Sequence, residues 1–162
     1  MRKLWLFQNK IEVVSGLHAV PELEDCWLQS NQISKLQGFE TLTQLQHLGL
    51  AGNLIVDFKE LKRLSVCTAL RAVSCSDIHF GRCPIADEAG YQEFTVLHLP
   101  QVTTLDGIAI TKETQLSAED IYYAQVSELS FPTNMLPGIT VRHYCRMSRK
   151  TTSYSIFVLI LI

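Results

Sequence analysis

Hydrophobic residues recur along the N-terminal third of the chain with a period of 22 positions. In each period two apolar residues flank one variable residue. The third residue after the second apolar residue is an asparagine, and the second residue after that asparagine is an isoleucine. The asparagines are Asn9, Asn31 and Asn53. Leu23 and Leu45 extend two of the copies to the pattern L-x-x-L-x-L-x-x-N-x-I, in which a cysteine fills one apolar position. An internal repeat of this length indicates a solenoid of stacked units.

Each unit predicts a short strand, a turn and a returning segment. The alternating apolar pair places two side chains on the inner face of a strand. The asparagine stands where the chain must turn, and its amide can bond backbone groups that the turn leaves unpaired. One unit cannot bury its own apolar side, so neighbouring units must stack. The pattern resembles the leucine-rich repeat, which implies an α/β solenoid. We expect a short curved parallel sheet on its concave face and helical or 3-10 segments on its convex side.

The fourth unit departs from this pattern. Residues 70–75 keep the apolar spacing, but they begin 25 positions after Leu45, and Ile78 stands where the asparagine belongs. Cys26 and Cys75 occupy inward positions, for which we prefer a small buried hydrophobe to a reactive thiol. From residue 77 to residue 93 the pattern is lost, and glycines and a proline predict an irregular loop.

Residues 91–107 resemble the C-terminal cap of one leucine-rich-repeat subfamily, that of the phosphatase-1 regulatory subunit and the U2 snRNP A-prime protein. The last repeat of that subfamily reads Y-R-x-x-V-L-x-x-L-P-x-L-x-x-L-D-G. Here Gln92 replaces the arginine, and only one residue separates Leu97 from Leu99. The whole pattern is also similar to the leucine-rich-repeat-containing protein nine type, a large protein with many repeats. A cap would shield the last leucines and the sheet edge from water.

These features divide the chain into four segments. Residues 1–76 are predicted to hold about four repeats, the first incomplete, and residues 77–116 the irregular loop and the cap. Ser117 and the acidic residues after it predict the start of a helix over residues 117–130. Residues 131–162 have no repeat and no acidic residue, and they end in a hydrophobic run. We expect this tail to be poorly ordered and prone to aggregation. Apart from aggregation through the tail, we expect the protein to be monomeric.

Composition narrows the functional classes. The chain has 14 basic and 16 acidic residues, and four of the basic residues lie in the tail, so residues 1–130 are acidic. We therefore expect no direct nucleic-acid binding, because phosphate recognition depends on Lys and Arg. The five cysteines are odd in number and lack metal-binding spacing, which favours free thiols in the cytoplasm. No apolar run approaches the roughly 20 residues that span a bilayer. Motifs for phosphate cradles, metals or hydrolases are absent from the sequence, so we predict no cofactor, no metal and no catalysis.

The candidate binding surface is the concave face of the predicted sheet, where the variable residues of successive strands form columns. Seven of them are predicted to contact a partner: Lys3, Trp5, Phe7, Asp25, Trp27, Gln29 and His47. The two indoles would lie on adjacent strands about 4.8 Å apart and could stack, and tryptophan is enriched in binding hot spots. As alternatives, the aromatic residues are ordinary surface residues, or Trp5 contacts a preceding repeat. Asp25 and His47 could pair across strands, although we favour solvated side chains.

We therefore predict a protein-interaction module or scaffold that grips a helix or loop of another protein. The subfamily resemblance implies a cytoplasmic protein of a ciliary or phosphatase-regulating assembly. One alternative is a structural component of a ribonucleoprotein, possible in the nucleus, that reaches RNA only through a protein partner. A further alternative is that the chain is a fragment or splice variant without independent function, because Met1 stands inside a repeat.

Overall fold

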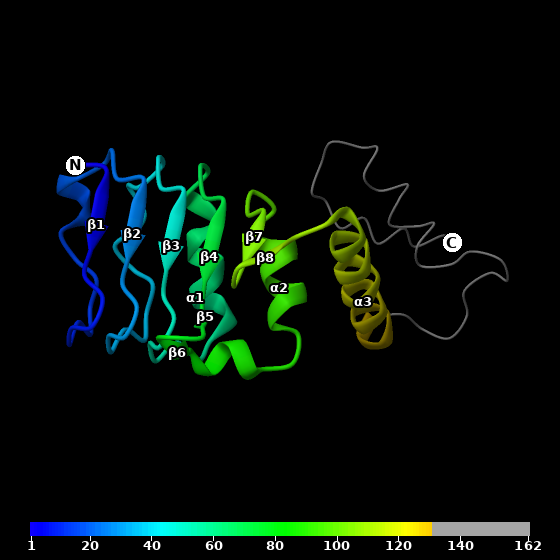
Figure 1. Ribbon diagram of the computed structural model, residues 1–162. Helices are drawn as coiled ribbons and strands as arrows, with labels where there is room; N and C mark the ends of the chain where they lie inside the picture. The colour runs from blue at the N-terminus through cyan, green and yellow to red at the C-terminus, as the bar shows by residue number, and fades with distance from the viewer. Residues whose placement is uncertain (131–162) are drawn as a thin grey trace, which may run out of the picture. The chain divides into compact units, whose positions relative to one another are not determined.

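A computed structural model of the chain describes residues 1–130, and Met1–Glu119 form one compact unit. Within the described residues, six short strands form one sheet in the order β1-β2-β3-β4-β7-β8 (Figure 1). They are β1 (Lys3–Trp5), β2 (Asp25–Trp27), β3 (His47–Gly49), β4 (Ala72–Ser74), β7 (Thr104–Leu105) and β8 (Ile108–Ala109). Neighbours run parallel except β7 and β8, which are antiparallel. Each of the four predicted repeats therefore contributes one parallel strand, which confirms the predicted sheet.

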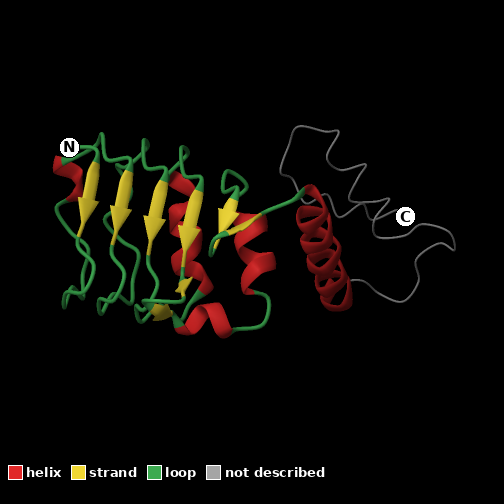
Figure 2. Cartoon of the chain, viewed as in Figure 1, coloured by secondary structure: helices red, strands yellow, loops and turns green. Residues whose placement is uncertain are grey.

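The segments that return from β1, β3 and β4 to the next strand of the sheet contain α or 3-10 helices, whereas the segment between β2 and β3 contains only bends and turns (Figure 2). The helices are η1 (Leu17–Ala19), α1 (Phe58–Arg63), η2 (Leu64–Val66), η3 (Pro84–Asp87) and α2 (Tyr91–His98). Helix α1 begins after Asp57, whose carboxylate accepts a hydrogen bond from the Lys59 amide at 2.8 Å and so satisfies a free N–H of the first turn. A parallel sheet with α and 3-10 return segments is the arrangement that the repeats predict.

The hydrophobic core lies between the sheet and these return segments. The repeat leucines Leu23 and Leu45 are fully buried, and so are Cys26 and Cys75 at their inward positions. Burial raises the pKa of Cys26 to about 12, so this thiol stays protonated near neutral pH. Both cysteines are therefore buried, as predicted. Leu4, on the edge strand β1, is only partly buried.

Asn31 and Asn53 are buried, and each connects its own repeat to the preceding repeat. The Asn53 side-chain oxygen accepts the Ile33 amide at 3.0 Å. Its side-chain nitrogen donates to the carbonyls of Leu28 at 2.9 Å and Leu50 at 2.6 Å. Asn31 makes the same three kinds of contact one repeat earlier. We call this series of contacts the asparagine ladder. It satisfies backbone groups at turns that are closed to water.

In the fourth repeat a cysteine takes the place of the ladder asparagine. The Cys83 thiol donates to the Leu50 carbonyl at 3.1 Å, and the Ile55 amide is among the groups that lower its pKa. These are the carbonyl and the amide of the preceding repeat that an asparagine would bond. Cys83 follows Cys75 by eight positions, whereas Asn53 follows Leu50 by three. The fourth repeat therefore contains an insertion.

The insertion forms a β-hairpin of β5 (Ser76–Asp77) and β6 (Gly81–Arg82). The prediction that Ile78 takes the asparagine position was wrong, because Ile78 lies at the hairpin tip and is 93% exposed. The prediction of an irregular loop over residues 77–93 was also wrong, since that segment contains the hairpin, η3 and the start of α2. The positive φ of Gly81 and Gly90 places them at a turn and a helix N-terminus.

The strands β7 and β8 are joined at Asp106 and Gly107, a turn in which both residues have positive φ, 51° and 79°. The Asp106 carboxylate accepts the amides of Cys75 at 2.6 Å and Ser76 at 2.8 Å. This turn therefore satisfies the backbone at the point where β4 ends and the hairpin insertion begins.

Helix α3 (Lys112–Ser130) begins five residues before the predicted position. The Thr111 hydroxyl accepts the Thr114 amide at 3.2 Å, so Thr111 is the N-cap and Ser117 lies inside the helix. The intervening residues are mostly good helix formers, which lets the helix extend back to the earlier capping residue. The predicted tail, residues 131–162, lies outside the described residues. In the part of the chain that is described, no helix is both long and apolar enough to cross a membrane.

The asparagine ladder predicts unequal effects of the same substitution. Asn53→Ala should lower the free energy of unfolding by about 2–4 kcal/mol, because it leaves buried backbone groups without partners. Asn9→Ala should cost less than about 1 kcal/mol, because exposed Asn9 bonds only carbonyls of its own turn. Urea unfolding followed by circular dichroism measures both. Equal losses would show that the contacts between repeats contribute nothing beyond the local turn.

Candidate functional site

The variable residues on the exposed side of the sheet align across the strands as predicted. Lys3, Asp25 and His47 are register partners on β1, β2 and β3. Trp5 pairs in the same way with Trp27. We call the surface formed by the seven predicted contact residues the sheet face.

Asp25 connects three strands at the sheet face. One carboxylate oxygen lies 2.9 Å from the Lys3 ammonium and the other 2.6 Å from Nδ1 of His47. An ionised carboxylate only accepts hydrogen bonds, so Nδ1 of His47 must carry the proton. Asp25 is 8% exposed, whereas the side chains of Lys3 and His47 are about half exposed. The preference for solvated Asp25 and His47 was wrong, because the parallel register places them directly opposite each other.

The environment of Asp25 favours its charged form. Burial alone would raise the pKa of this carboxyl, but the hydrogen bonds from Lys3 and His47 outweigh burial, and the pKa lies below its ordinary 3.8. The hydrogen bond to Asp25 raises the pKa of Lys3 above its ordinary 10.5. The three side chains thus form a fixed polar group in which the carboxylate has both oxygens occupied.

The aromatic residues form the apolar part of the sheet face. Trp5 is 59% exposed and Phe7 41% exposed. The ring contacts among the described residues do not include a stack of the two indoles. Gly49 explains the difference: a Cβ at this position would lie 2.8 Å from Cε3 of Trp27. The Trp27 ring therefore leans over the backbone of β3 rather than standing against Trp5.

The hairpin insertion covers part of the sheet face. The Phe80 ring lies 5.7 Å from the Phe7 ring, and the Phe80 carbonyl is in close contact with Gly52. Gln29, whose side chain lies against Gly49, is only 6% exposed, so its prediction as an accessible contact was wrong. A sequence pattern could not show this covering, because the hairpin comes from a later repeat.

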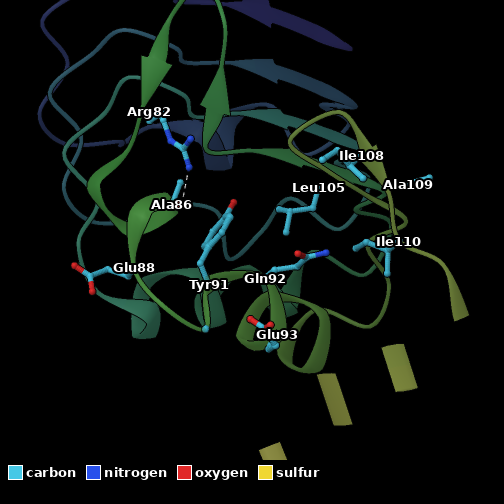
Figure 3. Close-up of a pocket in the computed structure, with 11 residues that line it drawn as sticks. Arg82, Ala86, Glu88, Tyr91, Gln92, Glu93, Leu105, Ile108, Ala109 and Ile110 are labelled. Atoms are coloured by element: carbon cyan, nitrogen blue, oxygen red, sulfur yellow. Dashed lines mark hydrogen bonds between the residues drawn. The ribbon is translucent and has the colours of Figure 1, made fainter. Parts of the chain in front are cut away.

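A second concavity lies outside the predicted site, between η3, α2 and the β7–β8 hairpin (Figure 3). It has a volume of about 300 Å³ and combines apolar residues such as Leu105 and Ile108 with the acidic Glu88 and Glu93. Arg82 at its border is held by Asp87 at 2.8 Å and by the Ala86 carbonyl at 2.9 Å.

Tyr91 also lines this concavity, yet its hydroxyl is buried. The hydroxyl faces Cys75 and Asp106 without completing a hydrogen bond among the described residues. Burial raises the pKa of Tyr91 far above its ordinary value. Tyr91 was visible in the sequence only as the first residue of the predicted cap. Across residues 1–130, no cluster of three or more His, Cys, Asp and Glu side chains could hold a metal ion.

Comparisons with known proteins agree with the repeat architecture. No protein-family model matches the chain. Leucine-rich repeat-containing protein 51 of Rattus norvegicus is 34% identical over 70 residues, which cover 43% of this chain and 34% of that protein. The chain thus spans about a third of the length of that relative.

Solved structures show the same fold. The Drosophila melanogaster SNF/U2A′ complex matches with a TM-score of 0.57 and 19% identity over 91% of this chain and 68% of that one. Internalin C2 of Listeria monocytogenes matches with a TM-score of 0.46 and 23% identity over 64% and 40% of the two chains. Together with the parallel sheet of repeats, the match to the SNF/U2A′ complex identifies the fold as a leucine-rich-repeat solenoid of the α/β class.

Gly52 and Gly107 form a matched pair for testing the covering hairpin. Both have positive φ, so alanine at either should cost roughly 1–2 kcal/mol through backbone strain. A Cβ at Gly52 would also collide with the Phe80 carbonyl, whereas nothing lies within 4 Å of a Cβ at Gly107. Gly52→Ala should therefore cost about 1–3 kcal/mol more than Gly107→Ala in urea unfolding. If the two variants were equally stable, the hairpin would not be packed on Gly52.

The polar group at Asp25 predicts a specific titration. The Asp25 carboxyl signal in carbon-13 NMR should titrate below pH 3.8, and Lys3→Met should raise its midpoint by removing the largest of the contacts that lower the pKa. Since the folded pKa is lowered, Asp25 stabilises the fold above pH 3.8, and this contribution is lost as pH falls through the lowered value. Lys35→Met removes the same charge at another exposed position and serves as the control. An unchanged midpoint in Lys3→Met would refute the contact.

Proposed function

We propose that this chain is a protein-interaction module whose sheet face binds another protein. The observation that carries the proposal is the exposure of Trp5 and Phe7 directly beside the fixed Lys3–Asp25–His47 group. Large exposed aromatic side chains next to an ordered polar group combine the two features of a binding hot spot, an apolar anchor and a polar rim.

The proposal limits the binding residues to the part of the sheet face that stays open. Lys3, Trp5 and Phe7 remain exposed, and Trp27 and His47 are partly accessible. Gln29 is buried against Gly49 and would not touch the partner. The polar group is already ordered by Asp25, so binding would immobilise fewer side chains, which lowers the entropic cost of association.

The more specific parts of the proposal rest on sequence resemblance. They are a cytoplasmic location, a ciliary or phosphatase-regulating assembly, a C-terminal cap in residues 91–107, and similarity to the leucine-rich-repeat-containing protein nine type. The alternative, a ribonucleoprotein component that reaches RNA through a protein, differs in the partner and not in the surface. An experiment on the surface therefore comes first.

Capture of partners from cell lysate by the full chain, with and without ribonuclease, tests the proposal. Trp5→Ala should reduce capture of a sheet-face partner at least tenfold, because truncating a hot-spot aromatic costs roughly 2 kcal/mol or more. Val66→Ala, at a residue of η2 that is 43% exposed, is the matched control and should retain capture. Circular dichroism verifies that both variants fold.

Salt and ribonuclease distinguish the alternatives. A partner anchored by aromatic contacts should persist between about 50 and 200 mM salt, whereas direct RNA contact should weaken steeply. A partner lost only after ribonuclease treatment would favour the ribonucleoprotein alternative. Equal capture by the parent and Trp5→Ala would remove the sheet face as the binding site.

A further inference from the structure

The hairpin insertion brings two cysteines together at its base. The register pairs Ser76 with Arg82, so the next pair along the ladder is Cys75 opposite Cys83. The Cys83 amide donates to the Cys75 carbonyl at 2.8 Å, which shows that the pairing continues to these residues. We infer that Cys75 and Cys83 are a thiol pair that a peroxide oxidises to a disulfide across the base of the hairpin.

The backbone geometry suits this bond. Directly opposed residues of an antiparallel pair have Cα atoms about 4.5–5.5 Å apart, which lies within the 4.4–6.8 Å range of disulfides. Side chains of such a pair point to the same side of the two strands. Both thiols are buried at this base, and each shifts the pKa of the other, which places them close together in the reduced protein.

The surroundings assign different roles to the two sulfurs. Hydrogen bonds from the Cys75 thiol and from the amides of Asn53 and Ile55 lower the pKa of Cys83, despite its burial. The same shared hydrogen bond, together with burial, raises the pKa of Cys75 well above its ordinary value. Cys83 is therefore the more acidic of the two thiols, so we assign it the attack on the peroxide and Cys75 the role of resolving thiol.

The chemistry balances with hydrogen peroxide as the oxidant. The Cys83 thiolate attacks one peroxide oxygen, the O–O bond breaks, and the second oxygen leaves as hydroxide and takes up a proton to form water. The Cys75 sulfur then attacks the resulting sulfenic acid. The S–S bond forms, the S–O bond breaks, and the hydroxyl leaves as water with the Cys75 proton. Both thiols are 0% exposed, so the reaction proceeds through local opening of the short hairpin.

Oxidation would replace a hydrogen bond of Cys83 with a covalent bond at the base of the hairpin. Cys83 would lose the S–H that bonds the Leu50 carbonyl, and the hairpin base would become covalently closed. The hairpin carries Phe80, which lies against Phe7 at the sheet face. The modification would therefore restrict the segment that covers part of this surface. The inference itself does not depend on the proposed function, because the bond is measured directly.

Mass spectrometry of the full chain tests the inference, because trypsin places each of the five cysteines in a different peptide. The native protein is treated with hydrogen peroxide, alkylated after unfolding and digested without reduction. Peptide 72–82 should be linked to peptide 83–112 at least ten times more often than any other pair of cysteine peptides. Cys26 and Cys67, which are equally buried, should remain alkylated. Two fully alkylated peptides after oxidation would overturn the inference.

Two controls separate the folded geometry from closeness in sequence. The same oxidation in urea should abolish the preference for this pair, and a preference that persisted would show that the fold does not arrange the thiols. With a sulfenic-acid probe, Cys75→Ser should be labelled at Cys83, whereas Cys83→Ser should leave Cys75 unlabelled. The reverse labelling would overturn the assigned roles. Cys67→Ser is the matched control and should keep the disulfide between peptides 72–82 and 83–112. The digest of the unsubstituted chain decides the inference even if a variant fails to fold.

Discussion

The sheet depends on one buried contact, in which a side chain of each repeat bonds the backbone of the repeat before it. Strands of two or three residues make few backbone hydrogen bonds, and the turns after them leave amides and carbonyls in places that water cannot reach. Asn31 and Asn53 donate and accept at the same time, so each satisfies the groups on both sides of the turn. The thiol of Cys83 takes the place of the asparagine as a weaker donor and bonds the Leu50 carbonyl.

The ladder allows the fourth repeat to carry an insertion without losing its register. The additional residues leave the solenoid between Cys75 and Cys83 and return at the position where the ladder contact is required. The hairpin that they form then folds over the sheet, where Gly52 leaves room for the carbonyl of Phe80. A single insertion therefore determines how much of the sheet face stays open, and it also places two thiols opposite each other.

The open part of the sheet face combines rigidity with exposed apolar surface. Asp25 orders Lys3 and His47 from a buried position on the central strand of the three, so the polar side chains do not need to be ordered on binding. Trp5 stands beside this group on the edge strand with more than half of its surface exposed. An ordered polar group beside an exposed indole is the physical basis for proposing a protein partner here.

The sequence by itself determined the repeat, the parallel sheet, its register and the inward positions, because these follow from side-chain periodicity and from the few residues that can satisfy a buried turn. It also placed Lys3, Asp25 and His47 in one row, since equal spacing in sequence becomes alignment across stacked strands. The tertiary structure alone decided which of these residues are accessible. Gln29 is buried, the Trp27 ring leans over Gly49, and Cys83 rather than Ile78 continues the ladder. Each of these outcomes depends on a contact with another repeat, and periodicity within one repeat carries no information about such contacts.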